Sequence, residues 1–126
     1  MKLNLNYKEM PSLPYIQRKE LPAEPGIYYV GNSDSPVMYV GFSRNLKSRH
    51  INHHRQRQFE NIKNAVICYR LITEDFLPKG SDVIGTLRKL EKQAINHYKP
   101  IFNYTPIPNK RKFTTVYGSN FIILRP

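Results

Sequence analysis

The sequence predicts an α/β protein of the α+β type, with a small, mostly antiparallel three-stranded sheet flanked by helices. Two short runs rich in β-branched and aromatic residues, 26–31 and 37–41, are separated by turn-forming residues, a pattern typical of a β-hairpin. A third apolar run at 65–72 indicates another strand, and residues 81–98 repeat apolar side chains at helical spacing. At 126 residues, the chain has room for a single domain.

The segment before the hairpin, residues 1–24, is expected to be an arm packed on the edge of the domain. Pro11, Pro14 and Pro22 exclude a long helix there. The domain itself is expected over 25–104. Residues 105–126 form an extension in which two apolar runs flank a turn, so a terminal hairpin fits.

The hairpin determines which tyrosines share a face of the sheet. Side chains alternate along a strand, so Ile27 and Tyr29 point to one face and Tyr28 to the other. A turn centred near residue ~34 would place Tyr28 opposite Tyr39 or Met38, or one step away.

A helix is expected to follow the hairpin over residues 43–54, with Ser43 as its N-cap. Arg49 and His53 are four residues apart and would lie on one face of it. The basic run 55–64 is predicted to be a loop or a weak helix.

The longest helix is expected over residues 81–98. Ser81 or Asp82 would cap its start and Pro100 would end it. Glu91 borders the apolar stripe of this helix, so its carboxylate can reach the body of the domain rather than only solvent.

The charge balance favours a polyanionic partner. Lys and Arg number 20 against 9 Asp and Glu, which gives a formal net charge of +11. Such an excess is typical of nucleic-acid binding, although it also serves solubility. The candidate phosphate contacts are Arg44, Lys47, Arg55, Arg57, Lys63, Lys110, Arg111 and Lys112.

The sequence offers no sign of export or of a membrane span. The one cysteine, Cys68, allows no disulfide and no cysteine-based zinc site within the chain. No run is long and apolar enough for a transmembrane helix, and the first residues lack the apolar region of a signal peptide. We therefore expect a cytoplasmic protein without a membrane partner.

Several motifs share the spacing of one family. The tripeptides Gly-Ile-Tyr at 26–28 and Tyr-Val-Gly at 39–41 are followed by Arg49, eight residues beyond the glycine, and His53 four residues later. Over residues 25–104 the chain thus resembles the GIY-YIG nuclease family. The family's closing pattern E-x6-Y-x-P-x2-N is matched by Glu91, Tyr98, Pro100 and Asn103.

The resemblance implies a DNA endonuclease that hydrolyses phosphodiester bonds with one metal ion, Mg²⁺ or Mn²⁺, held by Glu91. Arg49 would neutralise charge on the phosphate. Tyr28 would take the proton from water and Tyr39 would position water or phosphate. His53 would orient a tyrosine or relay a proton, and Asn103 would support the site. The expected partner is duplex or branched DNA.

Two other functions fit the same residues. A catalytically silent nucleic-acid-binding module could keep the fold and its basic surface, and a structural protein could use the charge to bind an acidic protein. A zinc site from His50, His53 and His54 is also compatible with helical spacing but less favoured. Each candidate residue alone would more often be an ordinary surface or core side chain. The joint spacing is what favours a nuclease.

Overall fold

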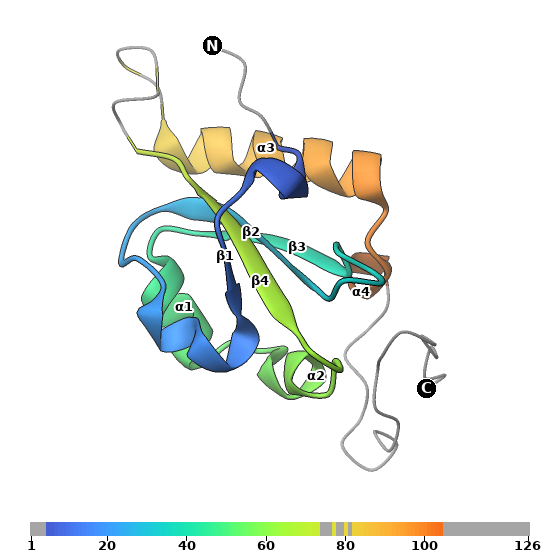
Figure 1. Cartoon of the computed structure of the whole chain (residues 1–126). Coiled ribbons are helices and arrows are strands. Elements are labelled where there is room, and N and C mark those ends of the chain that lie inside the picture. Colours follow the sequence, from blue (N-terminus) through green and yellow to red (C-terminus); the bar gives the residue numbers. More distant parts are fainter. Residues whose placement is uncertain (1–4, 74–76, 78–79, 81, 105–126) are drawn as a thin grey trace.

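The computed structural model describes residues 5–73, 77, 80 and 82–104, and the predicted C-terminal hairpin lies outside them (Figure 1). The described part is an antiparallel sheet flanked by helices, which confirms the predicted fold class. The sheet has four strands rather than three, in the order β1-β4-β2-β3. The strands are β1 (Ser12–Pro14), β2 (Gly26–Gly31), β3 (Tyr39–Ser43) and β4 (Val66–Leu71).

The additional strand, β1, comes from the proline-rich segment. It pairs with β4 from Ser12, opposite Cys68, to Pro14. Proline is tolerated there because β1 is an edge strand, where one row of backbone groups needs no partner strand. Two short 3₁₀ helices flank it, η1 (Tyr7–Glu9) and η2 (Tyr15–Glu20). Tyr15 and Leu21 are only 1% and 2% exposed, so this segment contributes to the core.

The register of the hairpin differs from the prediction. Tyr28 pairs with Gly41 and Val30 pairs with Tyr39, so the two tyrosines are diagonal neighbours and not opposite each other. The turn accounts for the shift. The Asn32 side-chain oxygen accepts hydrogen bonds from the backbone N–H groups of residues 34 and 35, which places the reversal later than expected.

The first helix is shorter than predicted. α1 (Leu46–Ile51) is capped by Asn45, whose side chain accepts from the Ser48 N–H, and not by Ser43. Because α1 ends at Ile51, His53 lies in the following turn and does not share a helix face with Arg49. α2 (Gln56–Glu60) follows within the segment predicted to be a loop or weak helix.

The long helix follows the prediction closely. α3 (Val83–Tyr98) begins after Asp82, whose carboxylate accepts from the N–H groups of Ile84 and Gly85. It ends at Lys99, which adopts a left-handed conformation (φ 49°) before Pro100. The short α4 (Ile101–Tyr104) completes the described chain.

The two faces of the sheet are covered by different helices. Tyr28 and Tyr39 lie in a buried cluster with Leu46 of α1 and Phe59 of α2. The other face, with Tyr29, packs against α3. Figure 1 shows α3 along one side of the sheet, with α1 and α2 at the other.

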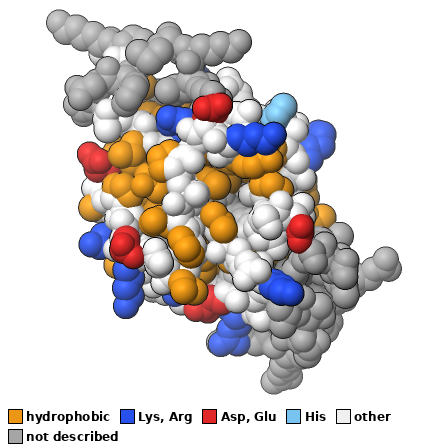
Figure 2. All heavy atoms as spheres, in the orientation of Figure 1, with side chains coloured by type: hydrophobic (Ala, Val, Ile, Leu, Met, Phe, Trp, Pro, Cys, Tyr) orange, Lys and Arg blue, Asp and Glu red, His pale blue; other side chains and the backbone are white. Residues whose placement is uncertain are grey.

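The surface in Figure 2 is mixed in character. Hydrophobic side chains gather in its middle, and Lys and Arg side chains stand around them. Within the described ranges, no helix has the length and apolar character needed to cross a bilayer.

Candidate active site

Tyr28 and Tyr39 form the centre of the candidate site. Their rings lie on one face of the sheet with centroids 6.2 Å apart. Tyr29 points to the other face, where its phenol donates a hydrogen bond to the Leu5 carbonyl at 2.6 Å. The alternation predicted from the sequence therefore separates Tyr28 from its neighbour Tyr29.

Gly41 provides the space that Tyr28 occupies. A Cβ at this position would lie 2.5 Å from the Tyr28 hydroxyl oxygen and 2.6 Å from the adjoining ring carbon. These distances are well inside van der Waals contact, so the glycine of the second tripeptide accommodates the tyrosine of the first.

His53 fixes the hydrogen bonding of Tyr28. Its Nε2 lies 2.6 Å from the Tyr28 hydroxyl, and its Nδ1 accepts the Arg55 backbone N–H at 2.9 Å. Burial lowers the pKa of His53 to about 2, so the ring is neutral. Because Nδ1 is an acceptor, the proton of the neutral ring sits on Nε2. His53 therefore donates to the Tyr28 oxygen, and its Nε2 cannot accept the phenolic proton.

The two tyrosines differ in their environment. Burial, with the neighbouring Tyr39, raises the pKa of the Tyr28 phenol strongly, and a hydrogen bond from Arg49 opposes this only in part. Burial also raises the pKa of Tyr39, but the guanidinium groups of Arg55 and Arg49 both favour its phenolate. Tyr28 is fully buried, whereas Tyr39 is 9% exposed. Tyr39 is therefore the easier of the two to ionise.

Arg49 lies on α1 at the exposed rim of this cluster. Its Nη2 donates to His54 Nδ1 at 3.3 Å, and its charge favours the phenolate forms of both Tyr28 and Tyr39. A permanently charged group that is both exposed and close to the tyrosines is suited to contact a phosphate.

Glu91 approaches the same tyrosines from α3. Its carboxylate is close enough to contribute to the raised pKa of both Tyr28 and Tyr39. Burial raises the pKa of Glu91 itself, and Arg88 opposes this shift. β3 is an edge strand, so groups from both sides of the sheet can meet there.

Asn103 joins α4 to β3. Its side-chain oxygen accepts the Val40 N–H and its amide donates to the Val40 carbonyl, each at 2.8 Å. Val40 lies between Tyr39 and Gly41. Asn103 therefore holds the backbone of the second tripeptide.

Arg55 is not the surface residue that the sequence suggested. It is 9% exposed, and its guanidinium carbon lies 5.3 Å from the centroid of the Tyr39 ring. Nothing in a run of alternating Arg and Gln residues indicates that this one is buried. Four other predicted phosphate contacts, Arg44, Lys47, Arg57 and Lys63, are exposed, whereas Lys110, Arg111 and Lys112 lie outside the described residues.

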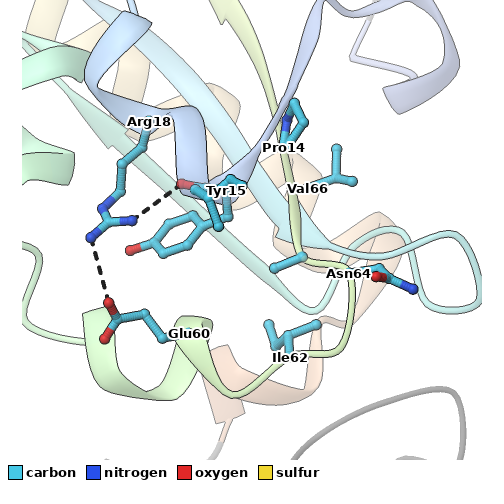
Figure 3. Close-up of a pocket in the computed structure, with 9 residues that line it drawn as sticks. Pro14, Tyr15, Arg18, Glu60, Ile62, Asn64 and Val66 are labelled. Carbon is cyan, nitrogen blue, oxygen red and sulfur yellow. Dashed lines mark hydrogen bonds and ion pairs between the residues drawn. The ribbon is translucent and has the colours of Figure 1, made fainter.

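A cavity of about 670 Å³ lies away from this cluster, where η2 faces α2 (Figure 3). Tyr15 lines it, and the Arg18–Glu60 ion pair, at 3.5 Å, closes one side. The rings of Tyr15 and Phe59 are in contact, with centroids 5.7 Å apart, and Phe59 in turn contacts Tyr39. The rings of Tyr15 and Phe59 therefore lie between the cavity and Tyr39.

Comparison with known families shows to which family the chain belongs. The family model described as the UvrC-like GIY-YIG domain matches residues 24–104. The chain belongs to this family. The match begins at the residues just before β2 and ends with α4. It therefore includes the candidate site residues Tyr28, Tyr39, Arg49, His53, Glu91 and Asn103.

Relatives of this GIY-YIG domain include much longer proteins named UvrABC system protein C. The protein from Brucella abortus is 36% identical over 85 residues, which is 68% of this chain and 13% of the relative. The protein from Synechocystis is 26% identical over 95 residues, or 75% of this chain and 15% of the relative. The chain thus spans about a seventh of these relatives.

Solved structures share the fold. The N-terminal GIY-YIG endonuclease domain of UvrC from Thermotoga maritima, with its catalytic divalent cation magnesium, gives a TM-score of 0.52 at 18% identity. The match covers 80% of this chain and 99% of that one. A point mutant of the same domain, also with its divalent cation, gives 0.53 at 16% identity, covering 82% and 100%.

The residues of this GIY-YIG domain fit a single hard cation better than a zinc site. Glu91 offers carboxylate oxygens, and no hydrogen bond or ion pair to them is found among the described residues. No group of three or more His, Cys, Asp or Glu in the described part of the chain could hold a metal. This also argues against the His50, His53 and His54 zinc site, because both His53 nitrogens are already hydrogen-bonded. One carboxylate, completed by water and phosphate, suits Mg²⁺.

Proposed function

We propose that this GIY-YIG domain is a metal-dependent DNA endonuclease that hydrolyses phosphodiester bonds with one divalent cation at Glu91. The observation that supports this best is that Arg49 and Glu91 both lie close enough to Tyr28 and Tyr39 to act on the pKa of their phenols. These four side chains supply an anionic ligand, a phosphate-binding cation and two phenols within one cluster. A magnesium ion at Glu91 would stabilise charge on the phosphate and on the leaving oxygen.

The protein groups then have distinct roles. Arg49 binds a non-bridging phosphate oxygen, where negative charge increases in the transition state. Tyr39 takes the proton of the attacking water, since two arginines favour its phenolate. Tyr28 orients water or phosphate with its own hydroxyl proton, because its oxygen already accepts from His53. This assignment exchanges the roles that the sequence suggested for the two tyrosines.

The exposed cations bind phosphates of the DNA backbone. Arg44, Lys47, Arg57 and Lys63 are free to reach phosphates because they are exposed. Contacts of this kind position a duplex without reading its bases. We therefore propose duplex or branched DNA as the substrate, with little sequence preference.

Plasmid nicking tests the proposal. Purified protein should nick supercoiled plasmid with Mg²⁺ and not with excess EDTA, and Glu91→Gln should abolish nicking because it removes the anionic ligand. Glu20→Gln, the same change at an exposed position in η2, should nick normally. Nicking that persists in Glu91→Gln would refute the assigned metal ligand. Salt-sensitive DNA binding without nicking by the wild type would instead support the silent binding module.

A further inference from the structure

We propose that Arg55 is a positioning residue for Tyr39: its guanidinium, held by Gln58, fixes the Tyr39 ring and stabilises its phenolate. This inference deepens the proposed function, and rests on it, because there Tyr39 takes the proton from water. It also takes Arg55 out of the set of DNA contacts to which its sequence position assigned it.

The backbone and the side chain of Arg55 contact different parts of the site. Its N–H donates to His53 Nδ1 at 2.9 Å, which sets the tautomer of that histidine. Its Nη1 donates to the Gln58 side-chain oxygen at 2.8 Å, and Gln58 is only 3% exposed. A buried amide one turn along α2 thus fixes the direction of the guanidinium.

The guanidinium acts on Tyr39 at short range. It lies 5.3 Å from the ring centroid, within the range of a cation–π interaction. Such a contact strengthens as the ring becomes an anion, because the cation then faces a full negative charge in a partly desolvated place. Arg55 therefore favours the form of Tyr39 that accepts a proton.

The other charged groups around Tyr39 act in both directions. Arg49 on α1 also favours the phenolate, whereas burial and the Glu91 carboxylate on α3 disfavour it. Tyr28 on β2, the neutral His53 and Phe59 on α2 also lie beside the ring. Arg55 is the more buried of the two cations, so we expect its removal to have a clear effect on Tyr39 ionisation.

A titration of Tyr39 alone tests this role without metal and without DNA. 3,5-Difluorotyrosine at position 39, whose fluorines make the phenol more acidic, gives one ¹⁹F NMR signal that follows its ionisation. Arg55→Met should raise the midpoint by about one pH unit, which is about a tenfold loss of phenolate at a given pH. Arg57→Met is the matched control, since Arg57 is exposed on α2, and it should leave the midpoint unchanged.

Two milder variants separate positioning from packing. Arg55→Lys keeps the charge, so it should raise the midpoint less than Arg55→Met. Gln58→Met leaves the arginine but removes its acceptor, and should also raise the midpoint. Equal midpoints in Arg55→Met and Arg57→Met would overturn the proposal. If Arg55→Met does not fold, unchanged midpoints in both Arg55→Lys and Gln58→Met would overturn it.

Nicking measured against pH links the titration to the reaction. In Arg55→Met the pH–rate profile should move to higher pH together with the Tyr39 midpoint. A profile that stays in place while the midpoint moves would show that Tyr39 is not the base. If the midpoint moves but the wild type nicks no DNA, the proposed function fails and the role of Arg55 at Tyr39 still stands.

Discussion

Tyr28 and Tyr29 are neighbours in β2, but their phenols point to opposite faces of the sheet. Tyr28 reaches His53 on one face of the sheet, and Tyr29 reaches the Leu5 carbonyl on the other. The same residue type thus occurs in the candidate active site and in a structural contact. Substitutions to phenylalanine, which remove only the hydroxyl, separate the two.

Phenylalanine at position 28 or 39 is expected to lower plasmid nicking by about a hundredfold, the usual effect of losing a proton-transfer or positioning group. Tyr29→Phe should nick normally and lose about 1 kcal/mol of unfolding free energy with its hydrogen bond to Leu5. Initial nicking rates and urea unfolding of the three variants would check this. An inactive but folded Tyr29→Phe would show that the wrong tyrosines have been assigned.

Arg49→Ala should retain the fold and most of the affinity for DNA yet nick at least about a hundredfold more slowly. Affinity changes little because Arg49 is one of many phosphate contacts. The rate falls because Arg49 is the cation proposed to stabilise the transition state. Lys89→Ala, an exposed position on α3, controls for loss of one charge. Filter binding and nicking rates should be compared at the same salt concentration, and unchanged turnover would remove Arg49 from the site.

Between elements, the decisive contact is the pair of hydrogen bonds between the Asn103 side chain and the Val40 backbone. It connects α4, which follows the helix of Glu91, to the strand of Tyr39. The sequence spacing identified Asn103 but not its partner, because residues 63 positions apart meet only in the folded chain.

Asn103→Asp tests this connection with almost no change of shape. A carboxylate can still accept from the Val40 N–H but cannot donate to its carbonyl. We expect a loss of about 1–3 kcal/mol in unfolding free energy, since the carbonyl of the buried Val40 loses its donor. Calorimetry would measure this, with Asn96→Asp, exposed on α3, as the control. Equal losses in the two variants would contradict it.

Sequence patterns predicted the hairpin, β4 and α3 because in each the apolar residues follow the pattern of a strand or helix, and turn or capping residues mark the ends. β1 was not predicted because it has three residues, one of them proline, and is too short to show an alternation of apolar and polar side chains. The turn register depended on one Asn32 side chain, and α1 ended sooner than its polar residues suggested. Spacing singled out Tyr28, Tyr39 and Glu91 as candidate site residues, and their roles stay predictions. Arg55 could not be found, because its burial results from packing between α2 and the tyrosines.

At the level of the whole molecule, buried histidines make stability depend on pH. Burial lowers the pKa of His50 to about 3 and that of His53 to about 2. In the unfolded chain both bind protons near pH 6.5. The contribution of these two histidines to stability is therefore fully present above pH 6.5 and is lost as the pH falls toward 3, because only the unfolded state gains protons on them in that interval.

The unfolding free energy should therefore fall by about 1.4 kcal/mol per pH unit for each of these histidines below pH 6.5. Urea unfolding at pH 7.5, 6.0 and 5.0 would measure the slope. His50→Phe should reduce it by about half, since His50 is fully buried and neither ring nitrogen has a hydrogen-bond partner among the described residues. His97→Phe, at an exposed position, is the control. A slope that His50→Phe leaves unchanged would contradict this account.

The charge of the whole molecule predicts how it binds DNA. A net charge of +11 with exposed cations near α1 and α2 should make affinity fall steeply with salt, by about 0.9 logarithmic unit per phosphate contact for each tenfold rise. Lys47→Gln and Arg57→Gln should each lower that slope by about one contact. Fluorescence anisotropy with duplex DNA would measure it. A binding constant that does not change between low and moderate salt would exclude this mode of binding.

The Asn103–Val40 contact also bears on the order in which the protein becomes competent during synthesis. The ribosome makes the hairpin with both tyrosines first, then α1 with Arg49, then Glu91, and only afterwards the asparagine that secures the hairpin. A nascent chain that stops between Glu91 and Asn103 already contains the proposed metal ligand, but the strand of Tyr39 is not yet secured. The nascent chain should therefore become able to cleave DNA only after residue 103 has left the ribosome, in a single late step.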